Sequence, residues 1–235
     1  MTRNLTARET RGTIAHVVER FGQTSRGVPL EVYLPQSKPV RYLVLAAQHG
    51  DEPESTVVLS HALRAVYSDD LAAAVVLAMN PEGLLRGMRG NGNGVDLNRN
   101  FPTSNWGSAP IFYRWSSEDP RDVQLSPGEA AASEPETKAL LQLIERVKPE
   151  AVVSIHAPLG CVDDPESSAL GVWLAEATAL PLVAEIGYPT PGSFGTWASE
   201  QGRSVITFEL PHESNEALRR RCESALIELL CGSAP

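Results

Sequence analysis

Hydrophobic residues fall into short, nearly continuous runs separated by polar stretches. Runs of this kind are typical of strands that are covered on both faces of a sheet. They occupy residues 41–47, 73–79, 151–156 and 204–210. Two further segments, 13–18 and 28–34, are rich in β-forming residues and flank a loop that contains Gly, Ser and Arg. We expect these two segments to pair as antiparallel strands.

Helical periodicity appears between these runs. We expect helices over residues 53–67, 134–147, 169–179 and 213–231, the first and last with apolar residues on one face. The second of these helices is expected to begin with Ser133 as its cap and Pro135 in its first turn. Because strand, helix and strand alternate around residues 41–79, the pattern predicts a βαβ unit and an α/β fold.

Three segments show neither the continuous apolar runs of buried strands nor the helical spacing of apolar residues. Residues 80–110 are rich in Gly and Asn, and we interpret them as a loop outside the core. A loop of this length is usually functional or disordered, and its arginines, Arg86, Arg89 and Arg99, favour function. Residues 111–132 continue irregularly, with aromatic residues that could pin the loop to the body: Trp106, Phe112, Tyr113 and Trp115. Residues 157–169 form a further expected loop, which carries Asp163 and Asp164.

Length and charge narrow the possible partners. A chain of 235 residues fits one α/β domain, residues 1–235, better than two small ones. Its formal charge of −9 argues against nucleic acid or an anionic membrane as a general partner. The three cysteines do not suggest a disulfide framework. Because we find neither a signal-peptide pattern nor a run of ~18 apolar residues, we expect a cytoplasmic protein, either monomer or homodimer.

Residues able to bind a metal follow three of the apolar runs. His49 and Glu52 come after the first run, His156 ends the third, and Glu209 lies in the last. Open α/β sheets bind ligands at the carboxyl ends of their strands. Two imidazoles and one carboxylate are the ligand set of a catalytic zinc ion, and a further carboxylate could act as the base. Spacing alone does not decide which carboxylate has which role.

Five segments of the chain carry a family resemblance. HGDE, NPEG, GVDLNRNFP, SIH and TFELP occur in the order found in the zinc carboxypeptidase family, and the match spans roughly residues 40–212. The resemblance implies an α/β fold with a mixed, twisted sheet of about eight strands flanked by helices on both faces. It also implies a zinc metallopeptidase that binds one Zn²⁺ per chain.

Individual residues match the family's motifs. The resemblance implies that His49, Glu52 and His156 bind zinc and that Glu209 is the general base. By the same resemblance, Arg89 steadies the oxyanion, and Asn98 and Arg99 hold the terminal carboxylate of the substrate. Tyr188 lies near the position of the family's mobile tyrosine. Two roles stay open for Asp96, which could orient either Arg99 or a zinc-binding histidine.

Within the family, the short chain and the HAPLGCVDDPE segment resemble members that act on cell-wall peptides. Those members hydrolyse the bond between γ-D-glutamate and meso-diaminopimelate in a murein tripeptide with a free carboxyl terminus. Asp51 stands where digestive members carry an arginine. An acid suits the distal amine of diaminopimelate, so we expect either Asp51 or the Asp163–Asp164 pair to bind that amine.

Three other functions compete with this hypothesis. A carboxypeptidase with a different side-chain preference would use the same motifs. A zinc deacylase of the aspartoacylase type shares HxxE and a distant histidine, but it is less consistent with DLNRNFP and TFELP. A binding module without catalysis would not need Glu209.

Overall fold

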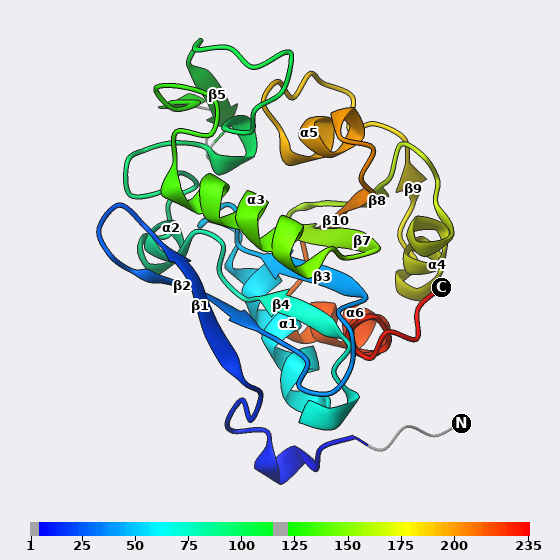
Figure 1. Ribbon diagram of the computed structural model, residues 1–235. Coiled ribbons are helices and arrows are strands. Elements are labelled where there is room, and N and C mark those ends of the chain that lie inside the picture. Colours follow the sequence, from blue (N-terminus) through cyan, green and yellow to red (C-terminus); the bar gives the residue numbers. More distant parts are fainter. Residues whose placement is uncertain (1–4, 115–121) are drawn as a thin grey trace.

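One mixed sheet organises the molecule. The computed structural model describes residues 5–114 and 122–235 (Figure 1). Eight strands pair in the order β1 (Val18–Gln23), β2 (Pro29–Tyr33), β4 (Ala73–Val76), β3 (Tyr42–Ala46), β7 (Ala151–His156), β10 (Val205–Pro211), β8 (Leu159–Asp163) and β9 (Leu182–Val183). The central strands β4, β3, β7 and β10 are parallel. Antiparallel pairs join β1 to β2, β2 to β4 and β8 to β10, and β9 pairs in parallel with β8. The predicted mixed sheet of about eight strands is confirmed.

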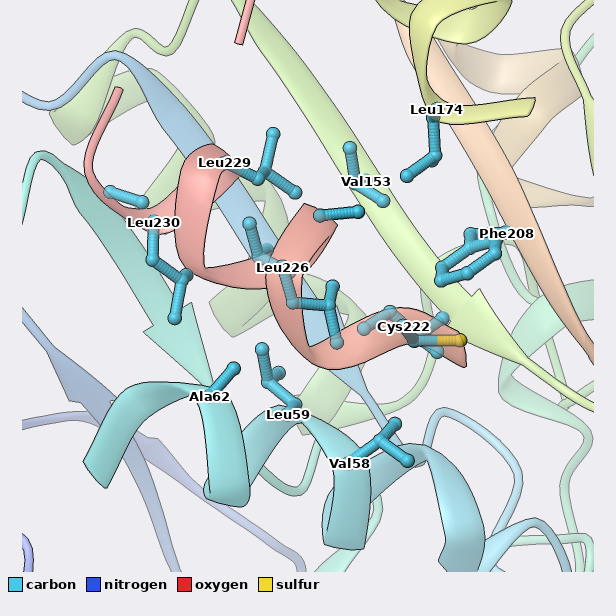
Figure 2. Packing of buried hydrophobic residues seen from close by; sticks show 14 of the residues in the cluster. Val58, Leu59, Ala62, Val153, Leu174, Phe208, Cys222, Leu226, Leu229 and Leu230 are labelled. Atoms are coloured by element: carbon cyan, nitrogen blue, oxygen red, sulfur yellow. The ribbon is translucent and has the colours of Figure 1, made fainter. Parts of the chain in front are cut away.

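Helices cover both faces of the sheet, as predicted. On one face lie α1 (Pro53–Ala65), α4 (Ala169–Thr178) and α6 (Asn215–Leu230), and on the other lie α3 (Pro135–Val147) and α5 (Phe194–Glu200). Alternate residues of β3 pack on the two opposite faces of the sheet. Val44 packs with the first group and Leu43 with the second, because successive strand side chains point to opposite faces. Figure 2 shows the first core, where α1 and α6 meet Val153 and Phe208.

The first predicted strand is wrong in its position. Residues 13–17 are not in a strand, and β1 instead begins at Val18 and includes Gly22, which the sequence pattern suggested was loop. β1 lies at the sheet edge and is largely exposed, so it shows no apolar alternation. A Cβ atom on Gly22 would lie 2.6 Å from the Cβ of Ala139, so the glycine lets α3 approach the strand. The antiparallel pairing with β2 is confirmed.

The segments expected to be irregular contain ordered elements. Residues 80–110 include α2 (Pro81–Arg86) and the 3₁₀ turn Leu97–Arg99, and Asn91 and Phe101 within them are buried. Strands β5 (Ile111–Arg114) and β6 (Asp122–Leu125) form a small antiparallel sheet, while Trp115 lies outside the described residues.

Two further boundaries differ from the prediction. The expected loop 157–169 contains β8, whose pattern is weak because the strand begins with the exposed Leu159 and the half-buried Gly160. Glu134, rather than Ser133, occupies the N-cap of α3. The remaining 3₁₀ turns are Arg8–Thr10 and Ser68–Asp70. In the described part of the chain, no helix combines the length and apolar character that a bilayer crossing requires.

Candidate active site

The end of β3 positions His49 and Glu52. Ala47 leaves the strand in the left-handed region, with φ of 50°. Its N–H donates to Ser55 Oγ, which in turn donates to the carbonyl of Glu52. Glu52 is the N-cap residue of α1 and is followed by Pro53. The strand end and the helix start are thus tied together, and the turn between them holds both metal-binding side chains.

Three side chains converge at the carboxyl ends of β3 and β7. His49 Nδ1 lies 2.7 Å from Glu52 Oε1, and His156 Nδ1 lies 3.0 Å from Glu52 Oε2. The two Nδ1 atoms are themselves 3.2 Å apart. All three residues are buried. Among the residues that the structure describes, these three are the one group of His, Cys, Asp or Glu side chains placed to hold a metal ion.

The geometry of this cluster fits zinc. Tetrahedral zinc with bonds of ~2.0–2.1 Å to nitrogen separates its ligand atoms by roughly 3.3 Å. The 3.2 Å between the Nδ1 atoms of His49 and His156 matches that spacing. Two imidazole nitrogens and a carboxylate that face one another at these distances suit a bound cation, which can accept a lone pair from each.

Outer contacts fix both imidazole rings. His49 Nε2 lies 3.2 Å from Asp96 Oδ1, and His156 Nε2 lies 3.0 Å from Ser154 Oγ. Contacts of this kind select the tautomer that leaves Nδ1 free to bind metal. The open question about Asp96 is settled geometrically, because it contacts a zinc-binding histidine. Ser154 was missed from the sequence, although its position two residues before His156 places it on the same face of β7.

Acidic and basic side chains at the cluster stabilise one another's charged forms. Burial opposes ionisation of Glu52, but His49 and His156 beside it hold its pKa well below the usual range. Burial and Arg89 disfavour the charged form of His49, yet Glu52 and Asp96 outweigh them and raise its pKa to about 9. Burial likewise opposes ionisation of Asp96, and Arg89 and His49 keep its pKa low.

Arg89 reaches the cluster from the loop after α2. Its Nε donates to Asp96 Oδ2 at 3.3 Å and one terminal nitrogen donates to Glu52 Oε1 at 3.2 Å. The loop docks because Gly50 leaves room for it. The Gly50 N–H donates to the Arg89 carbonyl, and a Cβ on Gly50 would lie 2.0 Å from the carbonyl carbon of Gly83. The guanidinium also lies over the ring of Tyr113, 5.3 Å from its centroid.

Glu209 stands beside the zinc ligands on β10. Its Cα pairs with that of His156 in the parallel ladder, so both side chains leave the sheet at the same level. The side chain is 7% exposed, and Oε2 accepts a hydrogen bond of 3.4 Å from the N–H of Leu159. Burial raises the pKa of Glu209, His156 opposes that shift, and Glu52 adds to it. A carboxylate with a raised pKa can accept a proton and hold it.

One cavity of about 450 Å³ joins these groups. The predicted site residues that line it are His49, Glu52, His156, Arg89, Asn98, Arg99, Tyr188 and Glu209. Asn98 uses its carbonyl oxygen to accept from the N–H of Phe194, which leaves its NH2 group available. A terminal nitrogen of Arg99 donates a hydrogen bond to the Asn98 carbonyl, and burial lowers the pKa of its guanidinium. Tyr188 is 54% exposed at the cavity rim.

Asp51 is placed apart from the other predicted site residues. It is exposed and is not among the residues that line the cavity. Although the residue as a whole is exposed, the protein partly surrounds its carboxyl, and this burial raises its pKa, while Arg89 lowers the pKa and Glu52 raises it. The cavity residues of α5, including Thr196 and Ser199, were not predicted, because the Gly- and Pro-rich stretch before them gives no sign of where the helix starts.

Comparisons with known proteins agree with this site. A family model described as Zinc carboxypeptidase matches residues 8–158, more than half of the chain. The chain is 46% identical to murein peptide amidase A of Escherichia coli (strain K12) over 226 residues, which cover 95% of this chain and 93% of the relative.

Solved structures agree with the fold. The crystal structure of a murein-tripeptide amidase from Escherichia coli O157 matches with a TM-score of 0.93 and 43% identity, covering 98% of both chains. Carboxypeptidase A from Helicoverpa armigera, at 20% identity, shares the fold with a TM-score of 0.72 over 94% of this chain and 68% of its own. This chain belongs to the zinc carboxypeptidase family, and His49, Glu52 and His156 form its zinc site.

Proposed function

We propose that this chain is a zinc-dependent amidase that hydrolyses the bond between γ-D-glutamate and meso-diaminopimelate in a murein tripeptide. The observation that carries the proposal is a single cavity that contains the zinc ligands, the buried carboxylate of Glu209 and the guanidinium of Arg99. The 46% identity to murein peptide amidase A supports a murein peptide as the substrate.

The residues of the cavity divide the reaction between them. A bound zinc ion supplies Lewis-acid polarisation of the scissile carbonyl and of a water molecule. Glu209 takes a proton from the attacking water while the water oxygen bonds to the carbonyl carbon. Glu209 then gives that proton to the amine nitrogen of diaminopimelate as the carbon–nitrogen bond breaks. Its buried position supports this role, since burial favours the protonated carboxyl that the second step requires.

Arg89 stabilises the charge that develops on the carbonyl oxygen. Its contacts with Asp96 and Glu52 hold the guanidinium in place before the substrate arrives. A donor fixed in this way needs no reorganisation during the reaction, and one such donor contributes roughly 10²–10³ in rate.

Arg99 and Asn98 bind the free carboxylate of diaminopimelate. A planar guanidinium can grip a carboxylate through two parallel hydrogen bonds, and the NH2 group of Asn98 adds a third donor. Tyr188 at the rim closes over the bound peptide. The role of Asp51 stays a prediction, and its place outside the cavity lining favours another acid for the distal amine.

Mass spectrometry of L-Ala-γ-D-Glu-meso-diaminopimelate tests the proposal. Incubation with the zinc-loaded protein should release free diaminopimelate, and the metal-free protein should release none. An intact tripeptide, together with cleavage of an N-acyl amino acid, would instead identify a deacylase of the aspartoacylase type. Release of other carboxyl-terminal residues at equal rates would identify a less selective carboxypeptidase.

Other properties follow from the proposed role in cell-wall peptide recycling. We expect residues 1–235 to act as one catalytic domain in the cytoplasm, where recycled peptides are degraded. Cell fractionation with an antibody to the chain tests the compartment. Sedimentation velocity distinguishes the monomer from the homodimer.

A further inference from the structure

The cavity continues beyond the zinc ligands between β8 and β10. Thr207 and Glu209 both line it, whereas Phe208 between them packs into the core on the opposite face. The antiparallel register places Asp163 opposite Thr207 and Cys161 opposite Glu209. Asp163 also lines the cavity. It therefore stands in the cavity wall two residues along the strands from the level of the proposed base.

The Asp163 carboxylate lacks a compensating group. Its Oδ1 atom is buried and accepts no hydrogen bond from any residue in the described ranges. No lysine, arginine or histidine within those ranges forms an ion pair with it. Burial, and then the neighbouring Asp164, raise its pKa. Because a buried acceptor without a donor is unfavourable, this arrangement favours a ligand that brings a cation.

Neighbouring acids are occupied or exposed. Asp164 is buried, but its Oδ2 accepts from both the N–H and the hydroxyl of Ser168, each at 2.7 Å, at the start of α4. Its Oδ1 accepts from the N–H of Glu166. The side chains of Glu166 and Glu185 line the same cavity but are exposed, so water screens their charges. Among these acids, Asp163 is the one with a buried oxygen that accepts no hydrogen bond, and therefore the one that a cationic ligand would stabilise.

The displacement of Asp163 along the strands from the level of Glu209 matches the length of a diaminopimelate side chain. Two residues along a strand cover roughly 6.5 Å. In carboxyl-terminal diaminopimelate, four carbon–carbon bonds of ~1.5 Å separate the two amino-bearing carbons and span roughly 5 Å when extended. The distal nitrogen lies one further bond away. A residue cleaved at the level of Glu209 would thus bring its distal amine to the level of Asp163.

From this placement we propose that Asp163 binds the ammonium group at the far end of the substrate's carboxyl-terminal side chain. Asp163 would then be a specificity-determining residue, which selects peptides that end in a residue with a distal amine. The inference rests on the proposed function, because it assigns one residue of that amidase's side-chain pocket. It assigns to Asp163 alone a role that the sequence left open between Asp51 and the Asp163–Asp164 pair.

A matched pair of tripeptides tests the proposal. Both have the form L-Ala-γ-D-Glu-X, where X is meso-diaminopimelate or 2-aminopimelate, which keeps the distal carboxylate but lacks the distal amine. The zinc-loaded wild-type chain should prefer diaminopimelate in kcat/KM. One charge-assisted hydrogen bond corresponds to a preference of about 10–100-fold. Asp163→Asn should lose that preference by slowing only the diaminopimelate peptide, and Glu166→Gln should keep it.

Several results would overturn the assignment. Equal kcat/KM of the wild-type chain for the two peptides would do so, and this result does not depend on any variant folding. The assignment would also be overturned if zinc-loaded Asp163→Asn kept the preference, or if its kcat/KM fell equally for both peptides. Asp163→Glu, which restores the carboxylate, should recover part of the preference. If the wild-type chain releases product from neither peptide, the proposed function itself is wrong.

Discussion

The Nδ1 atoms of His49 and His156 lie 3.2 Å apart, although 107 positions separate the two residues in the chain. The parallel strands β3 and β7 are neighbours, and their carboxyl ends bring the two imidazoles to one edge of the sheet. Neither ring can turn its outer nitrogen toward the partner without breaking a contact to Asp96 or Ser154. The fold thus brings two metal-binding nitrogens to one point.

Removing one imidazole should abolish zinc binding. In His156→Ala, only His49 and Glu52 remain, and two protein ligands do not make a stable zinc site. We expect the zinc content after dialysis, measured by inductively coupled plasma mass spectrometry, to fall from one ion per chain to nearly none. His61→Ala, which removes a histidine of α1 outside the cavity lining, should retain the ion. One zinc ion per chain in His156→Ala would contradict the assigned site.

Glu209→Gln should separate zinc binding from turnover. The amide fills the same space on β10 but cannot accept a proton from water. Zinc content should stay at one ion per chain, while kcat for the murein tripeptide should fall by about 10²–10⁴-fold. Thermal unfolding of both proteins provides the control for folding. Undiminished kcat in the variant would rule out Glu209 as the base.

The central sheet could be predicted because its strands are buried on both faces. β3 and β7 are buried along their whole length, so their sequences are continuous apolar runs that end at the site. The polar residues at the ends of these runs are unusual for a protein core. The zinc ligands could therefore be found from strand ends and family motifs, and His49, Glu52 and His156 are confirmed as a cluster.

Buried polar networks could not be predicted in this way. Asn91 donates to Glu134 and Glu136 across more than forty positions, and Asn100 exchanges hydrogen bonds with residues 127–134. The composition of this segment is that of a loop, although its asparagines are buried. The partners that bury them are distant in sequence, so the segment itself does not reveal them. The edge strand β1 was misplaced and β8, which lies next to the edge strand β9, was missed for a related reason. Their exposed residues carry no alternation, so their pairing depends on neighbours that are distant in sequence.

Asp96→Asn should weaken zinc binding without removing a ligand. Asp96 accepts from His49 Nε2 and the Asn98 N–H through Oδ1, and from Arg89 Nε through Oδ2. The amide replaces one acceptor by an NH2 group that would face a donor. Mutation of an outer partner of this kind typically lowers metal affinity by about 10–100-fold.

Competition with a chromophoric zinc chelator would measure this change in affinity. Asp69→Asn, which neutralises an exposed acid of the 3₁₀ turn Ser68–Asp70 outside the cavity lining, provides the charge-matched control. An unchanged zinc affinity in Asp96→Asn would show that the contact with His49 does not orient the ring.

His16 should make folding stability depend on pH. The residue is 8% exposed, and neither ring nitrogen has a hydrogen-bond partner within residues 5–114 and 122–235. Burial lowers the pKa of His16 from its ordinary value of 6.5. Between the lowered pKa and 6.5, the unfolded chain binds more protons than the folded chain, so stability rises with pH across that window and falls on acidification.

His16→Gln removes this titration while keeping a polar side chain. The free energy of unfolding of the zinc-loaded protein, measured by urea denaturation at about pH 7.5 and about pH 5, should fall less in the variant than in the wild type. All other titrating groups are shared by the two proteins and cancel in the comparison. An equal fall in both would mean that His16 is protonated in the folded chain as readily as in the unfolded chain, and that water reaches its ring.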